Sequence, residues 1–399
     1  MSQNLSTDHS RAVLDGEHSE GMGFVPISSR ADRLRSFDPA AFGEPTGSEE
    51  EWRFTRLKDL SPTFEDAPSD QDALDVVLDR AGTEDLPGLA PGQAPRGDAL
   101  IPGDLPAALG SKHTESAHHV RLADGQVLAE PIRVTLTAKD GKRSHSHIVI
   151  EAGRDSQGLV LLEHAGTGVH NGNVEIIVGE NANLTVVSLQ LWEDDAVHAG
   201  QHEAKLGAHA TYRHINVTLG GKAVRLTNNV QYAGERGDAE LLGLYFVDNG
   251  QHLEHQTYIN HTAPNCKSNV TYKGALQGES AHSVWIGDVL IGVEAEGTDT
   301  YELNRNLVLT EGARADSVPN LEIETGEIEG AGHASATGRF DDEQLFYLRS
   351  RGVPEDVARR LVVRGFFAEL ITQIGIPEIQ DRLMAMIEEE LDQTMKVVE

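Results

Sequence analysis

The sequence is poor in cysteine, in basic residues and in long apolar runs, and each shortage excludes a class of protein. Cys266 is the single cysteine among 399 residues, so no intrachain disulfide can form. Lysine and arginine number 33 against 64 acidic residues, which gives a net charge of −31. A surface of that charge repels phosphate backbones, so we expect no binding to nucleic acid. No run approaches the roughly 18 apolar residues that a transmembrane helix needs, so we expect no membrane span.

The first residues, MSQNLSTDHS, contain no basic stretch followed by an apolar one. That start predicts no secretory signal. Together with the near-absence of cysteine, it indicates a cytoplasmic protein. The acidic excess is typical of a soluble chain whose contacts are with other proteins.

Short apolar and β-branched runs dominate the middle of the chain, at about residues 126–338. Glycine, asparagine and aspartate separate these runs, as is typical of strands joined by turns. The predicted strands are Val134–Ala138, His147–Glu151, Leu159–Glu163, Val174–Val178, Leu184–Trp192, Thr211–Leu219, Val224–Tyr232, Leu241–Val247, Asn269–Leu276, Ser283–Ile291 and Ser317–Ile323.

Glycines that follow these strands recur at irregular intervals, at Gly179, Gly207, Gly234, Gly278 and Gly312. A solenoid whose turns vary in length gives this pattern, whereas a strict six-residue repeat does not. The sequence therefore predicts a mainly β fold, a right-handed parallel β-helix. An antiparallel sandwich is the alternative.

The flanks of the β region differ from it in composition. Residues 1–27 are polar and aperiodic and are interpreted as a disordered tail. Residues 28–125 are predicted to hold a helical region and a linker rich in proline and glycine. Its helices are expected after Ser48, which could form a capping box with Glu51, and over Ala73–Ala81.

Residues 339–399 are predicted to form a C-terminal helical domain after the β-helix core of residues 126–338. A first helix ends at Gly352, a second begins at Pro354, and a third begins at Pro377. Apolar residues in the later helices recur at helical spacing. We expect these helices to cover the open end of the solenoid, to bind a partner, or to do both.

Eighteen histidines raise the question of a metal site. The closest spacings are those of His118 with His119, of His145 with His147, and of His252 with His255. No carboxylate or cysteine beside any pair completes a ligand set, so each pair is interpreted as part of a solvated strand or turn. Cys266 has no CxxC partner and is interpreted as a small buried apolar residue. No nucleophile-elbow, P-loop or dinucleotide motif is present.

His333 lies in a different context, the small-residue stretch Gly330–Gly338 (GAGHASATG). We interpret this stretch as flexible, with the imidazole accessible. A neutral imidazole there could bind iron whose remaining ligands come from a second chain. A loop histidine without function is the alternative.

The C-terminal stretch Phe340–Val353 (FDDEQLFYLRSRGV), followed by PEDVARRLVVRGF, resembles the SufB/SufD family of iron–sulfur cluster assembly subunits. The likeness extends over about residues 40–395 and includes shorter stretches upstream, namely Glu50–Thr55, Lys273–Leu276, Asn304–Leu307 and Ser317–Ile323. SufB members normally have a longer N-terminal part and cysteines in the late strands. This chain has neither, so it is similar to the SufD branch.

The resemblance implies a right-handed β-helix with helical flanks, acting as a non-catalytic subunit of a SufB–SufC–SufD scaffold. SufB is expected to pair with the last β-helix strands, and the ATPase SufC to dock on the helices of residues 341–395. A transient iron–sulfur cluster is expected at the SufB–SufD interface, with His333 as a ligand and thiolates supplied by SufB. Ala331 stands where some relatives carry a cysteine. A homodimer of the isolated chain is left open.

Two other functions remain as alternatives. A β-helix enzyme acting on carbohydrate would need clustered carboxylates and bases along an exposed groove, and no such cluster is evident. A stand-alone structural or homodimeric binding module is the second alternative.

Overall fold

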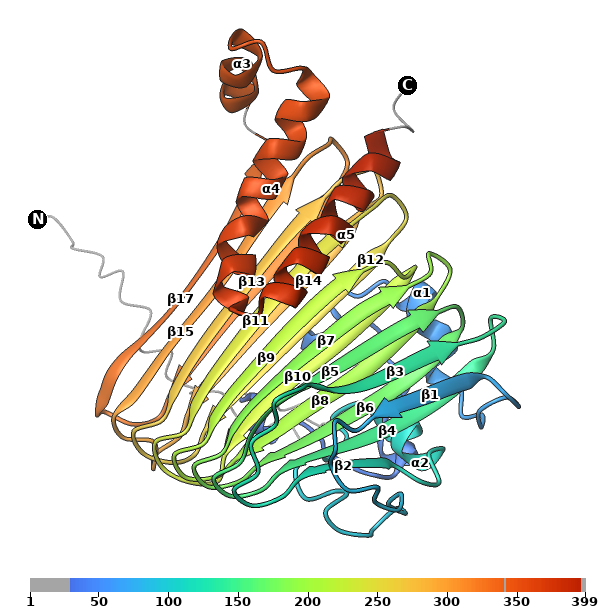
Figure 1. Cartoon of the computed structure of the whole chain (residues 1–399), viewed down its shortest axis with the longest axis vertical. Helices are drawn as coiled ribbons and strands as arrows, with labels where there is room; N and C mark the ends of the chain where they lie inside the picture. The colour runs from blue at the N-terminus through green and yellow to red at the C-terminus, as the bar shows by residue number, and fades with distance from the viewer. Residues whose placement is uncertain (1–28, 341, 396–399) are drawn as a thin grey trace, which may run out of the picture.

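A computed structural model describes residues 29–340 and 342–395, and two long sheets dominate it (Figure 1). The predicted disordered tail of residues 1–27 lies outside the described residues. The strands are β1 Leu74–Asp79, β2 His118–Leu122, β3 Ile132–Ala138, β4 Arg143–Ala152, β5 Gln157–Gly166, β6 Val169–Val178, β7 Asn183–Trp192, β8 Val197–Leu206, β9 Thr211–Leu219, β10 Ala223–Tyr232, β11 Asp238–Val247, β12 His252–His261, β13 Lys267–Leu276, β14 His282–Ile291, β15 Thr298–Val308, β16 Arg314–Ile323 and β17 Ile328–Arg339.

Short helical elements precede the β region, and longer helices follow it. The 3₁₀ turns are Arg30–Asp32, Pro39–Ala41, Glu50–Trp52 and Ser61–Phe64; the helices are α1 Leu57–Leu60, α2 Leu105–Lys112, α3 Asp342–Ser350, α4 Glu355–Ile374 and α5 Pro377–Met395. No helix of residues 29–340 and 342–395 is long and apolar enough to span a membrane.

The strands alternate between the two sheets along the chain. Odd-numbered strands form a nine-stranded sheet in the order β1 to β17, and even-numbered strands form an eight-stranded sheet in the order β16 to β2. Each strand from β2 onward pairs in parallel with the strand two further along, while β1 pairs antiparallel with β3. The predicted parallel β-helix is therefore confirmed, and the antiparallel sandwich is wrong.

A column of aliphatic side chains holds the turns together from inside. In-register pairing places one residue of each even strand from β4 to β16 in this column. Its members are Ile150, Ile176, Ala204, Val230, Ile259, Val289 and Leu321. Because side chains alternate across a strand, a slip of one residue would turn such a column outward, so the core fixes the register.

One residue per turn adopts a left-handed backbone conformation between an even strand and the next odd strand. These residues, with φ between 55° and 60°, are Asp155, Asn181, His209, Arg236 and Asn265. Aspartate and asparagine tolerate this conformation better than most residues. This conformation recurs at a non-glycine residue in five successive turns, from the β4–β5 connection to the β12–β13 connection.

Helices α4 and α5 lie on the outer face of the nine-stranded sheet rather than over the open end of the solenoid (Figure 1). Phe367 and Leu383 belong to a buried cluster with outward-facing apolar residues of the sheet, such as Val187 and Leu244. The apolar stripe predicted for the last helix is confirmed: Ile379, Leu383, Ile387 and Leu391 are all buried. Of the expected roles of these helices, covering the open end is not found, because the odd strands offer them a larger apolar face; binding a partner stays a prediction.

Apart from β1, which joins the nine-stranded sheet, the segment of residues 29–112 packs against the outer face of the eight-stranded sheet. Asn171 of β6 donates a hydrogen bond to the carbonyl of Thr63 at 3.0 Å, and α2 packs against β4, β6 and β8.

The helices predicted for this N-terminal segment are mostly wrong. Ala73–Ala81 contains strand β1, whose Leu74, Val76 and Leu78 all face the core, and the region after Ser48 forms only a 3₁₀ turn and the single-turn α1.

Histidines occupy part of the β-helix interior. His164, His170 and His198 are buried beside Trp192, with imidazole ring centroids 5.2 to 6.3 Å apart. Burial lowers the pKa of His164 to about 4 and that of His198 to about 3, because the interior disfavours the charged form. The folded chain therefore holds these rings neutral.

We expect the free energy of unfolding to fall steeply below about pH 6.5, where imidazoles of the unfolded chain take up protons that the interior rings do not. This stability is fully present above about pH 6.5 and is lost as the pH falls toward the folded-state pKa values near 3 to 4. Each buried histidine contributes about 1.4 kcal/mol per pH unit in that window. Urea unfolding between pH 7.5 and pH 4.5 measures the slope. His198→Asn should reduce it, whereas His209→Asn, at an exposed turn, should not; equal slopes in both variants would contradict the interpretation.

Candidate functional site

His333 lies in strand β17, the last strand of the nine-stranded sheet, and not in a flexible stretch. The small residues of this stretch allow close packing against β15. A Cβ at Gly332, for example, would come 3.2 Å from the ring of Tyr301 on β15. The imidazole is exposed, as predicted. Ala331, two residues earlier, packs against the interior core.

The β-helix is open at this end. Within residues 29–340 and 342–395, no strand pairs with the outer edge of β16 or of β17. Residues of β16 are only half-buried, and much of β17 is exposed. Unpaired edges of this kind are templates for a strand of another chain. The C-terminal helices leave this end uncovered.

Glu302 of β15 is the register partner of His333, one turn further inside. Its side chain is fully buried and has a hydrogen bond only with the Thr257 hydroxyl, at 3.5 Å to Oε1. Oε2 has no partner in the described part of the chain. Burial, and secondarily Asp288, raises the pKa of Glu302 to about 8. The sequence reasoning missed this residue, although the alternation of Thr300, Glu302 and Asn304 could have placed it on the inner face.

A cavity of about 490 Å³ adjoins His333 on the outer side of the last even strands. The N-terminal segment forms one wall, with Arg30 bonded to Asp288 at 2.5 Å and Ser29 bonded to Glu322 at 2.8 Å. Charged groups that line this cavity are therefore largely paired with one another. The cavity is polar and open rather than a closed ligand pocket.

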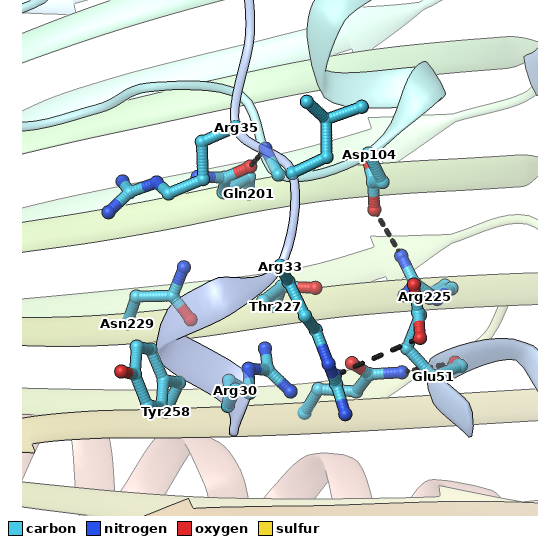
Figure 2. A pocket seen from close by; sticks show the side chains of 13 residues that line it. Arg30, Arg33, Arg35, Glu51, Asp104, Gln201, Arg225, Thr227, Asn229 and Tyr258 are labelled. Carbon is cyan, nitrogen blue, oxygen red and sulfur yellow. Dashed lines mark hydrogen bonds and ion pairs between the residues drawn. The ribbon is translucent and has the colours of Figure 1, made fainter. Parts of the chain in front are cut away.

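A second, smaller pocket of about 60 Å³ lies between the N-terminal segment and the eight-stranded sheet (Figure 2). Arg225 of β10 reaches Asp104 at 2.5 Å and Glu254 at 3.0 Å, and its guanidinium lies 3.7 Å from the centre of the Trp52 ring. The arginines of this pocket have carboxylate partners: Arg30 with Asp288, Arg33 with Glu50 and Glu51, and Arg35 with Glu203. The pocket is therefore a set of ion pairs that fastens the N-terminal segment.

The histidine pairs do not form metal sites. His145 bonds the carbonyl of Ala67 and His147 bonds Glu175, both beneath the N-terminal segment. His252 faces outward toward Glu254, whereas His255 faces inward toward Thr218, so the two cannot share an ion. In the described residues, no group of three or more histidines, cysteines and carboxylates could hold a metal.

Their interpretation as solvated residues is also wrong for most of them. His119, His145, His147, His252 and His255 are buried. Packing of the N-terminal segment covers the outward-facing rings, which the sequence pattern could not indicate.

Cys266 is buried in the interior core directly before β13, as predicted. Its thiol lies 3.5 Å from the carbonyl oxygen of Gly234, and burial raises its pKa. Both features oppose formation of a thiolate. The residue therefore packs as an apolar side chain.

Helix α3 extends beyond the β-helix and packs against α4 (Figure 1). It exposes large apolar side chains, Phe346 at 74% and Tyr347 at 57%. Val357 and Leu361 of α4 are exposed as well. Exposed apolar side chains gathered on one region indicate a contact surface for another protein. We call these four residues the α3–α4 surface.

Comparison with known proteins agrees with this architecture. The description "SUF system FeS cluster assembly, SufBD core domain" applies to residues 134–366, and the chain belongs to this family. An iron–sulfur cluster assembly SufBD family protein of Mycobacterium bovis is 49% identical over 92% of this chain and 94% of its own length. A Mycobacterium leprae protein of the same description is 50% identical over 89% of this chain and 93% of its own length, and SufD of Escherichia coli is 24% identical over 88% and 90%. These relatives give no support to the carbohydrate-active alternative.

The Arg225 ion pairs lead to a prediction about stability. Arg225→Ala leaves Glu254 and Asp104 without their buried cation, and loss of one partner of a buried pair costs about 3–5 kcal/mol. We expect that loss in urea unfolding, together with faster proteolysis of residues 29–112. Arg154→Ala is the control, since Arg154 and its partner Glu180 are both exposed and such pairs contribute less than about 1 kcal/mol. Similar losses in the two variants would show that the pocket does not fasten the segment.

Proposed function

We propose that this chain is the SufD-like, non-catalytic subunit of a cytoplasmic SufB–SufC–SufD scaffold for iron–sulfur cluster assembly. The observation that carries the proposal is the open end of the β-helix, where unpaired strand edges flank an exposed imidazole. The similarity to SufD of Escherichia coli over 88% of the chain supports the same role. ATPase activity belongs to the SufC subunit in this proposal.

SufB pairs with the open end through the edges of β16 and β17. A partner β-helix could continue both sheets by main-chain hydrogen bonds, which needs no particular side chains on the edge. The half-buried residues of β16 support this assignment, because a second chain would complete their burial. The isolated chain could use the same edges to form a homodimer.

SufC docks on the α3–α4 surface. Phe346 and Tyr347 supply apolar area on α3, which follows β17 in the chain and packs against α4. Lys273 of β13 bonds Glu369 of α4 at 2.6 Å, and Arg213 of β9 bonds the carbonyl of Ile374 at 2.8 Å. These contacts would carry a pull on the helices to the sheet and toward the shared edge with SufB.

His333 binds the nascent cluster at the shared edge, with thiolates supplied by SufB. An imidazole nitrogen suits iron, and the position of His333 on the exposed end strand leaves it accessible to a partner. Because Ala331 offers no thiolate and Cys266 is buried, this chain would not hold a cluster by itself.

Complex formation tests the partners. With an affinity tag on this chain and co-expressed SufB-type and SufC-type subunits, we expect both to co-purify. Phe346→Asp places a charge in the α3–α4 surface and should remove the SufC-type subunit while the SufB-type subunit is retained. Val127→Asp, an exposed apolar position at the opposite end of the β-helix, should retain both. A chain that purifies alone under these conditions would contradict the scaffold role.

Cluster reconstitution on the purified complex tests His333. His333→Ala removes a ligand and should lower the amount of cluster formed by about tenfold or more. Ser335→Ala, on the same face of β17 two residues away, should assemble cluster at the wild-type level. Visible absorption and iron content measure the outcome, and wild-type assembly by His333→Ala would remove the ligand assignment.

A further inference from the structure

A buried side chain, Glu302, and an exposed side chain, His333, lie on neighbouring strands near the open end of the β-helix. Glu302 and His333 are paired in register on adjacent parallel strands, so both project to the interior side of the sheet. Adjacent strands lie about 4.8 Å apart, and side chains of register partners stand beside one another. The imidazole faces solvent, and the carboxyl group lies one turn below it.

The carboxyl group of Glu302 lacks the partners that a buried acid normally has. A Cβ at Gly287 would come 2.8 Å from Oε2, so this oxygen points across the interior toward β14. Arg30 acts on the carboxylate only through space and is itself bonded to Asp288. The one hydrogen bond, from Thr257, is long at 3.5 Å. Buried polar groups are nearly always satisfied, so an unsatisfied one next to an accessible end points to a bound group.

Two of the side chains close to this oxygen are uncharged: Trp285 lies beside it over Gly287, and Thr257 lies on the neighbouring strand β12. The charge of Arg30, which acts on Glu302 through space, is offset by its ion pair with Asp288. A cation bound here would have an oxygen ligand from Glu302 and a nitrogen ligand from the accessible ring of His333.

We propose that Glu302 is a second ligand from this chain for the ferrous ion bound at His333. This inference rests on the proposed function and adds to it that the β-helix interior, and not only its edge, contributes to the site. One imidazole and one carboxylate form a ligand pair suited to divalent iron. The remaining positions would be filled by water in the free chain and by the partner's thiolates in the complex.

Binding of Co²⁺ alone to the purified full chain tests this pair, because its visible spectrum reports on the ligands. We expect one ion per chain, bound about tenfold or more weakly by Glu302→Gln and by His333→Ala. Glu302→Asp keeps the carboxylate but shortens the side chain and should bind with intermediate affinity. Glu327→Gln, an exposed position in the turn before β17, should bind as the wild type does.

The outcomes separate this inference from the proposed function. If Glu302→Gln binds Co²⁺ as the wild type does while His333→Ala does not, Glu302 is no ligand and the proposed function stands. If Glu302→Gln and Glu302→Asp both bind as the wild type does, the inference is overturned whatever His333→Ala does. If both Co²⁺ effects are found but His333→Ala still assembles cluster in the complex, the metal pair exists and the proposed role in assembly fails. Circular dichroism of each variant checks that the β-helix is folded.

Discussion

Every other feature of this chain depends on the in-register parallel pairing of each strand with the strand two positions further along. This pairing stacks one aliphatic side chain of each turn on the next, as in the column from Ile150 to Leu321. A stack of turns has two ends, at which the strand pairing stops. At one end β1 turns back antiparallel on the nine-stranded sheet, and Leu89 bridges Ala117 just before β2. At the other end, within the described residues, the last strand of each sheet, β16 and β17, is left with an unpaired parallel edge.

The two outer faces are covered by different physical means, and the difference decides which surfaces are free. The even strands carry polar residues outward, and ion pairs around Arg225 fasten the N-terminal segment to them. The odd strands carry apolar residues outward, and α4 and α5 bury them. With both faces occupied, the exposed end strand and the α3–α4 surface are the parts left to meet other proteins.

The interior is not uniformly apolar, and its polar residues affect both the stability of the fold and the candidate site. Rings such as His164 and His198 are held neutral by burial, which makes the fold sensitive to acid. Glu302 belongs to the same interior but lies one turn from the open end, beside His333. A buried polar side chain in the middle of the β-helix has only a structural role. A buried polar side chain one turn from the open end is available for binding.

The sequence by itself determined the β-helix, its approximate extent and the helical C-terminal part, because period-two apolar runs, turn residues and helical spacing are local patterns. The family came from the resemblance of motifs such as Phe340–Val353, and His333 was singled out by its small-residue surroundings and by that resemblance. Strands such as β8 and β12 escaped detection because their histidines and glutamines are buried only by packing, and Ala73–Ala81 is too short for its period to separate strand from helix.

Only the tertiary structure decided which face each helix covers, that His333 lies on an end strand, and that Glu302 stands beside it. These facts depend on which residues of distant turns share a register, as Glu302 and His333 do across 31 positions of sequence. Local sequence patterns hold no information about such pairings. The pairings arise only when each turn of the β-helix stacks on the turn before it.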